Sequence, residues 1–264
     1  KIIYHSGVGN TKLIAEIFFQ ELKKNDNVTL IDIHKESLTS ISNSDFLILG
    51  FPTYHCEPSK SMELFISKIK KAENPIPAFI FTTCGLYSSN TLRIFSKKCI
   101  DLNIVPVGSR SYRTSATDAV LLFPYIRFIK SYQKNTGKKI FSDIKLIKEL
   151  LERNTVLAKL PRFKLHSILN YPNKVFGKIL KRKIYLLINQ CIKCNLCIKN
   201  CPYHCFTQNT DFYPQFNIKN CENCYRCIHG CPETALSVYK NKPVKKQFNN
   251  EYFQKKKCDI RNNK

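Results

Sequence analysis

Eight cysteines in the last third of the sequence fall into two copies of one pattern, thirty residues apart. Each copy has the spacing C-x2-C-x2-C-x3-C-P, with Cys191, Cys194, Cys197 and Cys201 in the first run and Cys221, Cys224, Cys227 and Cys231 in the second. Three closely spaced thiolates in a tight loop can bind three corners of a 4Fe-4S cube, while a more distant cysteine binds the fourth corner. The spacing therefore predicts two 4Fe-4S clusters.

Zinc binding and disulfide formation fit this spacing less well. Zinc sites usually use two CxxC pairs separated by a longer loop, so the third cysteine of each run and the proline after the fourth would have no role. Cysteines two residues apart suit a wrapped metal loop better than disulfide bridges, and the sequence shows no secretory signal. We therefore expect reduced thiols and a cytoplasmic location.

The paired runs resemble those of the bacterial two-cluster ferredoxins. In that family the fourth cysteine of each run binds the cluster of the other run. The resemblance implies one ligand set of Cys191, Cys194, Cys197 and Cys231, and a second set of Cys221, Cys224, Cys227 and Cys201. The two runs would then be interlocked.

Cys205 lies four residues beyond the first run and could be taken for a ninth ligand. When the repeat is shifted by thirty residues, Cys205 aligns with Ala235, so this position requires a small residue near a cluster. We interpret Cys205 as a packing residue. The other cysteines have unrelated spacings and are interpreted as ordinary reduced thiols: Cys56, Cys84, Cys99 and Cys258.

Upstream of the runs, short β-branched segments alternate with segments of helical periodicity. This alternation predicts an α/β fold, a doubly wound parallel sheet of five strands covered by helices on both faces. The expected strands are 1–6, 28–33, 45–50, 78–83 and 104–109, and the expected helices are 11–24, 59–71, 90–100 and 143–151. Ligands of such sheets bind at the carboxyl ends of the strands, which selects the loops to consider.

The loop after the first strand combines glycines with hydroxyl groups directly before a helix. Its sequence is Ser6-Gly7-Val8-Gly9-Asn10-Thr11, and backbone N–H groups at a helix N-terminus favour a bound anion such as phosphate. The segment resembles the phosphate loop of flavodoxins, and the residues that match this loop are Ser6 and Gly9-Asn10-Thr11. Val8 departs from that pattern because it has no hydroxyl for the phosphate of FMN.

Two further loops correspond in position to the flavodoxin loops that hold the flavin ring. One contains Pro52, Thr53 and Tyr54, and the other contains Cys84, Gly85 and Tyr87. Flat aromatic side chains stack on a flat heterocycle, so the resemblance implies that the two tyrosines contact the ring. Either tyrosine could instead be a partly buried surface residue.

The whole arrangement resembles the flavodoxin-ferredoxin fusion proteins of anaerobic bacteria. The expected parts are a flavodoxin-like FMN domain over 1–155, a basic connector over 156–188 that packs against a domain, a two-cluster ferredoxin domain over 189–240, and a polar, basic tail over 241–264 whose composition suits disorder. The apolar patch within 110–141 has two interpretations, a cover for the flavin edge or a segment packed on the sheet. The resemblance implies an electron carrier that passes electrons between two 4Fe-4S clusters and an FMN.

The formal net charge of +24 narrows the choice of partner. Lysine is abundant over the whole length, arginine is scarce and no nucleic-acid motif is present, so we expect no nucleic-acid partner. No apolar run reaches the eighteen residues of a membrane span, so we expect a soluble protein, with peripheral membrane contact through its basic stretches as the remaining option. A redox partner protein, for which an acidic surface would be complementary, is the expected partner.

No constellation of residues marks a separate substrate reaction, yet two alternatives to the carrier stay open. One is a flavin-dependent reductase of a small acceptor that receives its electrons from the clusters. The other is a ferredoxin whose flavodoxin-like domain has lost FMN and serves as a docking module, which Val8 favours.

Overall fold

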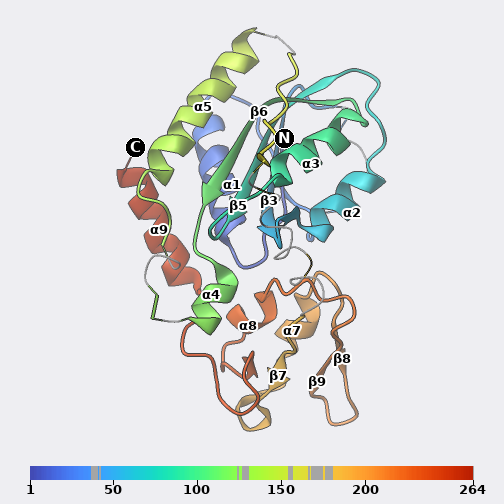
Figure 1. Cartoon of the computed structure of the whole chain (residues 1–264), viewed down its shortest axis with the longest axis vertical. Coiled ribbons are helices and arrows are strands. Elements are labelled where there is room, and N and C mark those ends of the chain that lie inside the picture. The colour runs from blue at the N-terminus through green and yellow to red at the C-terminus, as the bar shows by residue number, and fades with distance from the viewer. Residues whose placement is uncertain are drawn as a thin grey trace.

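The computed structural model describes residues 1–36, 41, 43–123, 125–126, 131–153, 157–165, 167, 175 and 181–263. Figure 1 shows an α/β part above a smaller part that carries the two cysteine runs. Several apolar residues of the predicted connector lie outside the described residues, namely Ile168, Leu169, Phe176, Ile179 and Leu180.

The larger part is a parallel sheet with the strand order β2-β1-β3-β5-β6. Its strands are β1 (Ile2–Tyr4), β2 (Leu30–Asp32), β3 (Leu47–Tyr54), β5 (Ile76–Cys84) and β6 (Ile104–Arg113), and the short β4 (Glu57–Pro58) adds antiparallel to the end of β3. All five predicted strands are confirmed. The strand order reverses between β1 and β3, so the loops that follow these two strands diverge and leave room for a ligand.

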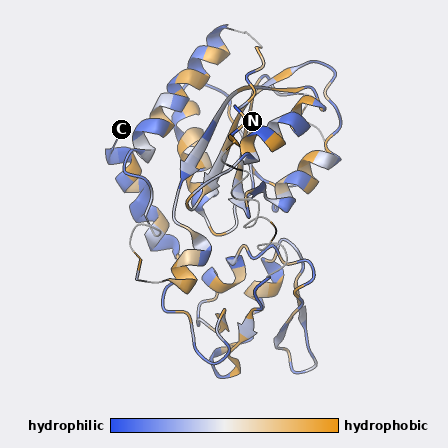
Figure 2. Ribbon diagram, in the orientation of Figure 1, coloured by the Kyte–Doolittle hydropathy of each residue, from blue (hydrophilic) through white to orange (hydrophobic). Residues whose placement is uncertain are grey.

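Helices cover both faces of this sheet, as predicted. The helices are α1 (Asn10–Leu22), α2 (Lys60–Lys68), α3 (Thr91–Ile100) and α5 (Thr136–Arg153). One apolar core joins α1 and α5 to the sheet through residues such as Phe18 and Ile144, and a second joins α2 and α3 through residues such as Met62 and Phe95. Hydrophobic and hydrophilic residues alternate along each of these helices, which is the pattern of helices that cover a core (Figure 2).

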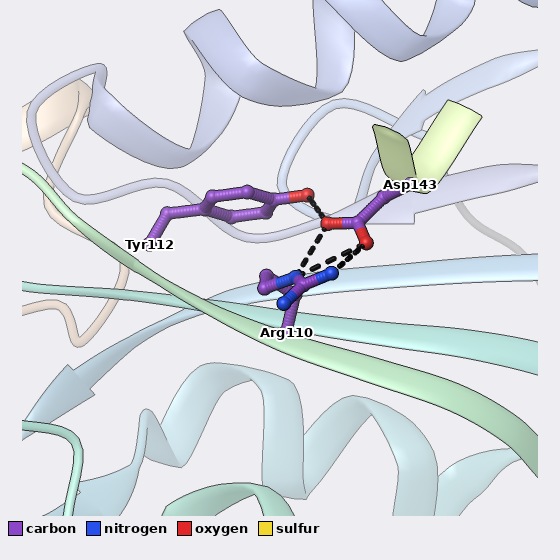
Figure 3. A network of polar contacts seen from close by, with 3 residues as sticks. All are labelled: Arg110, Tyr112 and Asp143. Carbon is purple, nitrogen blue, oxygen red and sulfur yellow. Dashed lines mark hydrogen bonds and ion pairs between the residues drawn. The ribbon is translucent and has the colours of Figure 1, made fainter. Parts of the chain in front are cut away.

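A buried carboxylate fixes α5 to the last strand of the sheet. Asp143 of α5 is 1% exposed, and it accepts hydrogen bonds from Tyr112 Oη at 2.6 Å and from Arg110 Nε at 2.8 Å. Figure 3 shows Arg110 and Tyr112 reaching from β6 towards this one carboxylate. A buried charge is tolerated only when it is paired and hydrogen-bonded, so the three side chains specify how α5 lies on the sheet.

The structure of the segment after β6 bears on the two interpretations of the apolar patch within 110–141. It forms the short helix α4 (Thr117–Leu122), whose Leu121 belongs to the apolar core of the smaller part. Ala119 and Phe123, by contrast, line the pocket described below. This helix therefore packs against the smaller part and borders the pocket, and it does not lie on the sheet.

The smaller part is built around the cysteine repeat. It contains the strand pairs β7 (Tyr185–Leu186) with β10 (Leu236–Ser237) and β8 (Phe206–Gln208) with β9 (Pro214–Phe216), the single-turn helix η3 (Ile188–Gln190), and the short helices α7 (Leu196–Lys199) and α8 (Arg226–His229). Positive φ angles recur thirty residues apart, at Lys193 and Asn223, Asn195 and Tyr225, and His204 and Thr234. The sequence repeat is thus also a repeat of backbone conformation.

The polar tail is ordered, so the expectation of disorder is wrong for the described residues up to 263. It forms α9 (Asn250–Asn262), in which Phe253 and Ile260 are seven residues apart and pack into the core shared by α1 and α5. The side chain of Asn249 caps the helix by accepting from the Tyr252 N–H at 3.0 Å. Phe253 and Ile260 on one helical face, together with the ion pair between Lys257 and Glu16, hold this otherwise hydrophilic segment against the sheet part.

The described part of the connector also packs, as expected. Asn90 accepts from the Lys164 N–H at 2.8 Å, and Arg93 donates to the carbonyl of Pro161 at 2.8 Å. The stretch 157–165 is therefore held against α3. None of the described helices is long and apolar enough to cross a membrane.

We predict that Asp143→Ala lowers the free energy of unfolding by about 2–3 kcal/mol, because it leaves Arg110 without its counterion in a half-buried position. Urea unfolding measures the loss. The triple change Asp143→Leu, Arg110→Met and Tyr112→Phe removes the whole polar group, and we expect it to recover most of that stability. A triple variant that is less stable than the single one would contradict this explanation.

Candidate functional site

A pocket of about 430 Å³ lies at the carboxyl ends of the central strands, and we call it the sheet-end pocket. Its size is within the range of about 300–1,000 Å³ that is typical for small-molecule sites. The predicted residues that line it are Ser6, Gly7, Asn10, Thr11, Pro52, Thr53, Tyr54, Cys84, Gly85 and Tyr87. Gly9 is the exception among the predicted residues, because it faces Phe253 of α9 instead.

The loop before α1 is held in place by its own side chains. Thr11 Oγ1 shares a hydrogen bond with Thr83 Oγ1 at 2.8 Å, and Asn10 Nδ2 donates to the Ser115 carbonyl at 2.9 Å. Gly9 precedes the helix with φ of 153°, a conformation that side chains rarely allow. These contacts fix the loop where the helix N-terminus borders the pocket.

Ser6 supplies the unsatisfied donor of this loop. Ser6 is 4% exposed, and its Oγ has no hydrogen-bond partner among the described residues. A buried hydroxyl without a partner costs about 1–3 kcal/mol, so such a group usually has a ligand or water to bind. Together with the free N–H groups at the start of α1, it is suited to a phosphate oxygen. The loop therefore fits the phosphate end of a flavin mononucleotide.

The two predicted ring tyrosines occupy different environments. Tyr54 is half-buried: its hydroxyl packs on Gly7, and desolvation raises the pKa of this hydroxyl well above its usual value. Tyr87 borders the pocket, with its ring 5.2 Å from the Lys164 ammonium and its hydroxyl 3.2 Å from that of Ser167. Both line the sheet-end pocket, and contact with a ring stays a prediction for each.

Two pocket residues come from the second cysteine run and were not predicted. Asn223 and Tyr225 stand between the cysteines of that run, and both line the sheet-end pocket. Their sequence context indicated proximity to a cluster, whereas nothing in the sequence placed the run against the loops of the other part. The pocket is thus built jointly by both parts of the chain.

The eight cysteines of the runs gather around two small cavities. One is lined by Cys191, Cys194, Cys197 and Cys231, which we call the outer set, and the other by Cys201, Cys221, Cys224 and Cys227, which we call the inner set. Each set combines three cysteines of one run with the fourth cysteine of the other. Among the described residues, no three Cys, His, Asp or Glu side chains converge on a single-ion site, whereas a four-iron cube needs sulfurs at separate corners.

Hydrogen-bond donors point at the sulfurs of the inner set. The backbone N–H of Asn223 donates to Cys221 Sγ at 3.3 Å, and that of Cys205 donates to Cys201 Sγ at 3.3 Å. The Cys205 thiol adds further hydrogen bonds, which lower the pKa of Cys201 to about 6 and also lower that of Cys221. The pKa of Cys205 itself is raised by the same contacts. Such donors stabilise thiolates, the form that binds iron, at Cys201 and Cys221, whereas burial raises the pKa of Cys224 and Cys227. The donors therefore suit a cluster at two of its four ligands.

Arg226 connects the inner set to the loop before α1. Its Nε donates to the carbonyl of Gly7 and its Nη2 to that of Ser6, both at 2.7 Å, while Nη1 donates to the carbonyl of Asn200 at 3.3 Å. One guanidinium thereby joins both cysteine runs to the phosphate-type loop. The planar donor group of arginine suits such a junction because its N–H groups have fixed directions.

Glu222 makes a second connection between the two parts. Its carboxylate accepts from the Lys60 N–H at the start of α2 at 2.8 Å and from the hydroxyl of Tyr203. Burial raises the pKa of Glu222 from its ordinary value of 4.5 to about 7. The carboxylate is therefore held at the interface near the midpoint of its titration at neutral pH.

A larger cavity, of about 570 Å³, lies on the other side of the loop before α1. It shares Ser6, Gly7 and Val8 with the sheet-end pocket, but it is lined by neither of the two predicted ring loops. The sheet-end pocket, which all three predicted loops reach, is therefore the better candidate for a flavin.

Comparisons with known proteins match different stretches of the chain. Residues 1–103 match the family model of the flavodoxin domain, so the N-terminal region is a flavodoxin domain. Among solved structures, the chain is similar to a flavodoxin from the domain Archaea, with 15% identity and a TM-score of 0.42 over 58% of this chain and 96% of that one.

Two curated relatives match shorter stretches. The ferredoxin-type protein NapF of Escherichia coli K12 is 35% identical over 52 residues, which are 19% of this chain and 32% of NapF. An archaeal-type glutamate synthase (NADPH) of Dehalococcoides mccartyi is 36% identical over 63 residues, which are 23% of this chain and 12% of that protein. The chain thus spans about a third or less of the length of these relatives.

We predict that Gly7→Ala destabilises the protein by about 1–3 kcal/mol, because the added methyl group would collide with the Tyr54 hydroxyl and lie 3.5 Å from Cys224 Cβ. Anaerobic urea unfolding gives the size of the effect. The double variant with Tyr54→Phe lacks the colliding hydroxyl and should recover part of the stability. Equal stability of Gly7→Ala and the unchanged protein would refute the close approach.

The raised pKa of Glu222 predicts a pH dependence of stability. Between pH 4.5 and 7 the folded protein binds the proton of this carboxyl more tightly than the unfolded chain does. The stability from this group is therefore complete below pH 4.5 and is lost as the pH rises through 7. From pH 5.5 to 8 we expect the protein to lose about 2 kcal/mol relative to Glu222→Gln, as followed by anaerobic unfolding. Parallel pH profiles of the two proteins would show that Glu222 keeps its ordinary pKa.

Proposed function

We propose that this chain is an electron-transfer protein that binds one FMN in the sheet-end pocket and a 4Fe-4S cluster on each cysteine set, and that it passes electrons between them. The observation that carries the proposal is the joint lining of this pocket by the flavodoxin-type loops and by Asn223 and Tyr225 of the second cysteine run. The flavodoxin domain and the ferredoxin-type relatives support the same assignment.

In this proposal each group has its own residues. Ser6 and the N-terminus of α1 would hold the phosphate of FMN, and Tyr54 and Tyr87 would flank its ring. The outer and inner cysteine sets would each hold one cluster. A flavin can exchange one or two electrons and each cluster exchanges one, so their combination can connect one-electron with two-electron chemistry.

The inner set is the one that adjoins the sheet-end pocket. Cys224 Cβ lies 3.5 Å from the position where a side chain of Gly7 would begin, and Gly7 itself lines the pocket. Tyr54 stands at this junction, with its hydroxyl against Gly7. The outer set includes the exposed Cys194 and is the set that an external redox protein could approach. This arrangement supports direct exchange between FMN and the inner cluster.

The positive charge of the chain suits this role in two ways. A net charge of +24 favours cofactors that become more negative on reduction, and it attracts a redox partner whose surface is acidic. We propose such a protein as the partner of this carrier.

The candidate without FMN has one observation in its favour. Val8 offers no hydroxyl, and the side chains of Asn10 and Thr11 are already used in hydrogen bonds within the flavodoxin domain. In that case the same domain would be a docking module for a two-cluster ferredoxin.

The test is the cofactor content of the full chain after strictly anaerobic purification, followed by flash reduction of the flavin. About eight irons, eight sulfides and one FMN per chain, with clusters that become reduced after the flash at a rate independent of protein concentration, are the expected result. Eight irons without flavin would support the alternative in which the flavodoxin domain is a docking module. Zinc in place of iron would overturn the proposal. A flavin that is reduced without later cluster reduction would exclude direct transfer.

Arg226→Met is the informative variant for this experiment, because it removes the bonds to the Ser6 and Gly7 carbonyls and leaves all eight cysteines in place. We expect unchanged iron content, weaker FMN binding and slower transfer. Lys145→Met, on α5, is the matched control with the same loss of charge. Transfer that slows equally in both variants would point to net charge and not to this junction.

A further inference from the structure

The two cysteine sets are related by the repeat but differ at one position beside the sulfurs. Cys205 lines the cavity of the inner set, and the aligned Ala235 lines that of the outer set. Each of these two residues is 2% exposed, so the two positions are equally buried. A fifth thiol therefore accompanies the inner set, and a methyl group takes its place in the outer set.

The surroundings of Cys205 determine where its thiol proton is directed. Its Sγ donates to the Tyr203 carbonyl at 3.6 Å, and it lines one cavity with Cys201 and Cys221, whose pKa values it lowers. A thiol has one proton, and anionic sulfurs are better acceptors than a neutral carbonyl because such bonds are charge-assisted. With thiolates on the inner set, the proton of Cys205 points at ligand sulfur.

Resting on the function proposed above, we infer that the Cys205 thiol donates a hydrogen bond to the ligand sulfurs of the inner set and thereby makes the inner cluster easier to reduce than it would be with alanine at this position. Cys205 is a positioning residue in this assignment and not a ninth ligand. From the sequence alone, Cys205 is interpreted as a packing residue. That interpretation accounts for its burial but not for the hydrogen bond that its thiol can donate.

The direction of the effect follows from charge. Reduction adds one negative charge to a cluster and its thiolates, so a donor that faces those sulfurs stabilises the reduced form more than the oxidised form. The backbone N–H of Cys205 also faces Cys201, but any residue at this position keeps that donor. The side chain alone distinguishes Cys205 from an alanine.

This difference would direct electrons within the molecule. The inner set adjoins the sheet-end pocket, whereas the outer set has the exposed Cys194. The thiol would then favour movement of an electron from the outer cluster to the inner cluster, beside the flavin. The difference between Cys205 and Ala235 thus favours an electron on the inner cluster, which is next to the proposed FMN.

The experiment is a redox titration of the full chain, loaded and kept anaerobic, in which electron paramagnetic resonance follows the two clusters. Cys205→Ala copies the residue of the outer set and should lower one of the two reduction potentials, by up to about tenfold in the equilibrium constant, or about 59 mV for one electron. Cys205→Ser keeps a donor and should hold that potential near or above its original value. Ala235→Cys is the reciprocal change and should raise the other potential.

Several results would overturn the inference. The first is no shift in Cys205→Ala, and the second is an equal shift in Cys205→Ala and Cys205→Ser, which would show packing alone. The third is that both reciprocal variants move the same potential. Iron content is measured in every variant, since a loss of about four irons in Cys205→Ala alone would show that Cys205 is itself a ligand.

The same samples separate this inference from the proposed function. A protein with eight irons and no FMN contradicts the flavin assignment but leaves the comparison of potentials intact. A protein that has both cofactors and yet shows no effect of Cys205 contradicts the inference alone. Absence of clusters from the unchanged chain refutes both.

Discussion

The close approach between the second cysteine run and the loop before α1 is the constraint on which the site depends. Arg226 donates to two successive carbonyls of that loop, and Gly7 has no side chain that would keep Cys224 and Tyr54 away. Because those carbonyls accept no backbone hydrogen bond from the residues that the structure describes, the guanidinium both satisfies them and aligns the two parts. Asn223 and Tyr225 reach the sheet-end pocket as a result.

The remaining contacts between the parts support this junction. Phe248 donates its backbone N–H to His229 Nδ1 at 3.0 Å, and the two rings stack with centroids 5.0 Å apart. His229 Nε2 lies 3.0 Å from the Thr117 carbonyl, so the neutral tautomer with the proton on Nε2 satisfies both bonds. Contacts on either side of α8 thereby keep the cysteine run at a fixed distance from the sheet. A rigid junction would suit the proposed electron transfer, whose rate would fall steeply with distance.

The sequence allowed the individual parts to be predicted more fully than their arrangement. Periodicity identified the strands and the helices over the sheet, and the spacing within the thirty-residue repeat identified the eight cysteines, because both signals arise from local geometry. The pairing of three cysteines of one run with the fourth of the other was implied by the resemblance to two-cluster ferredoxins. The contribution of Asn223 and Tyr225 to the pocket could not be foreseen, since it depends on docking between segments more than a hundred residues apart. The order of the tail was missed for a related reason: α9 has few apolar residues, and the core that Phe253 and Ile260 join is formed by α1 and α5, which lie far away in the sequence.

The position of α9 also has a consequence for biosynthesis. This helix follows both cysteine runs in the sequence, yet its Phe253 and Ile260 complete the core around α1, which is made near the start. Domains generally fold in the order in which they are synthesised. The flavodoxin domain can therefore fold before α9 is made, and Phe253 and Ile260 join its core only after the cysteine runs have been synthesised. Docking of α9 would thus mark a chain in which both cysteine runs are already present.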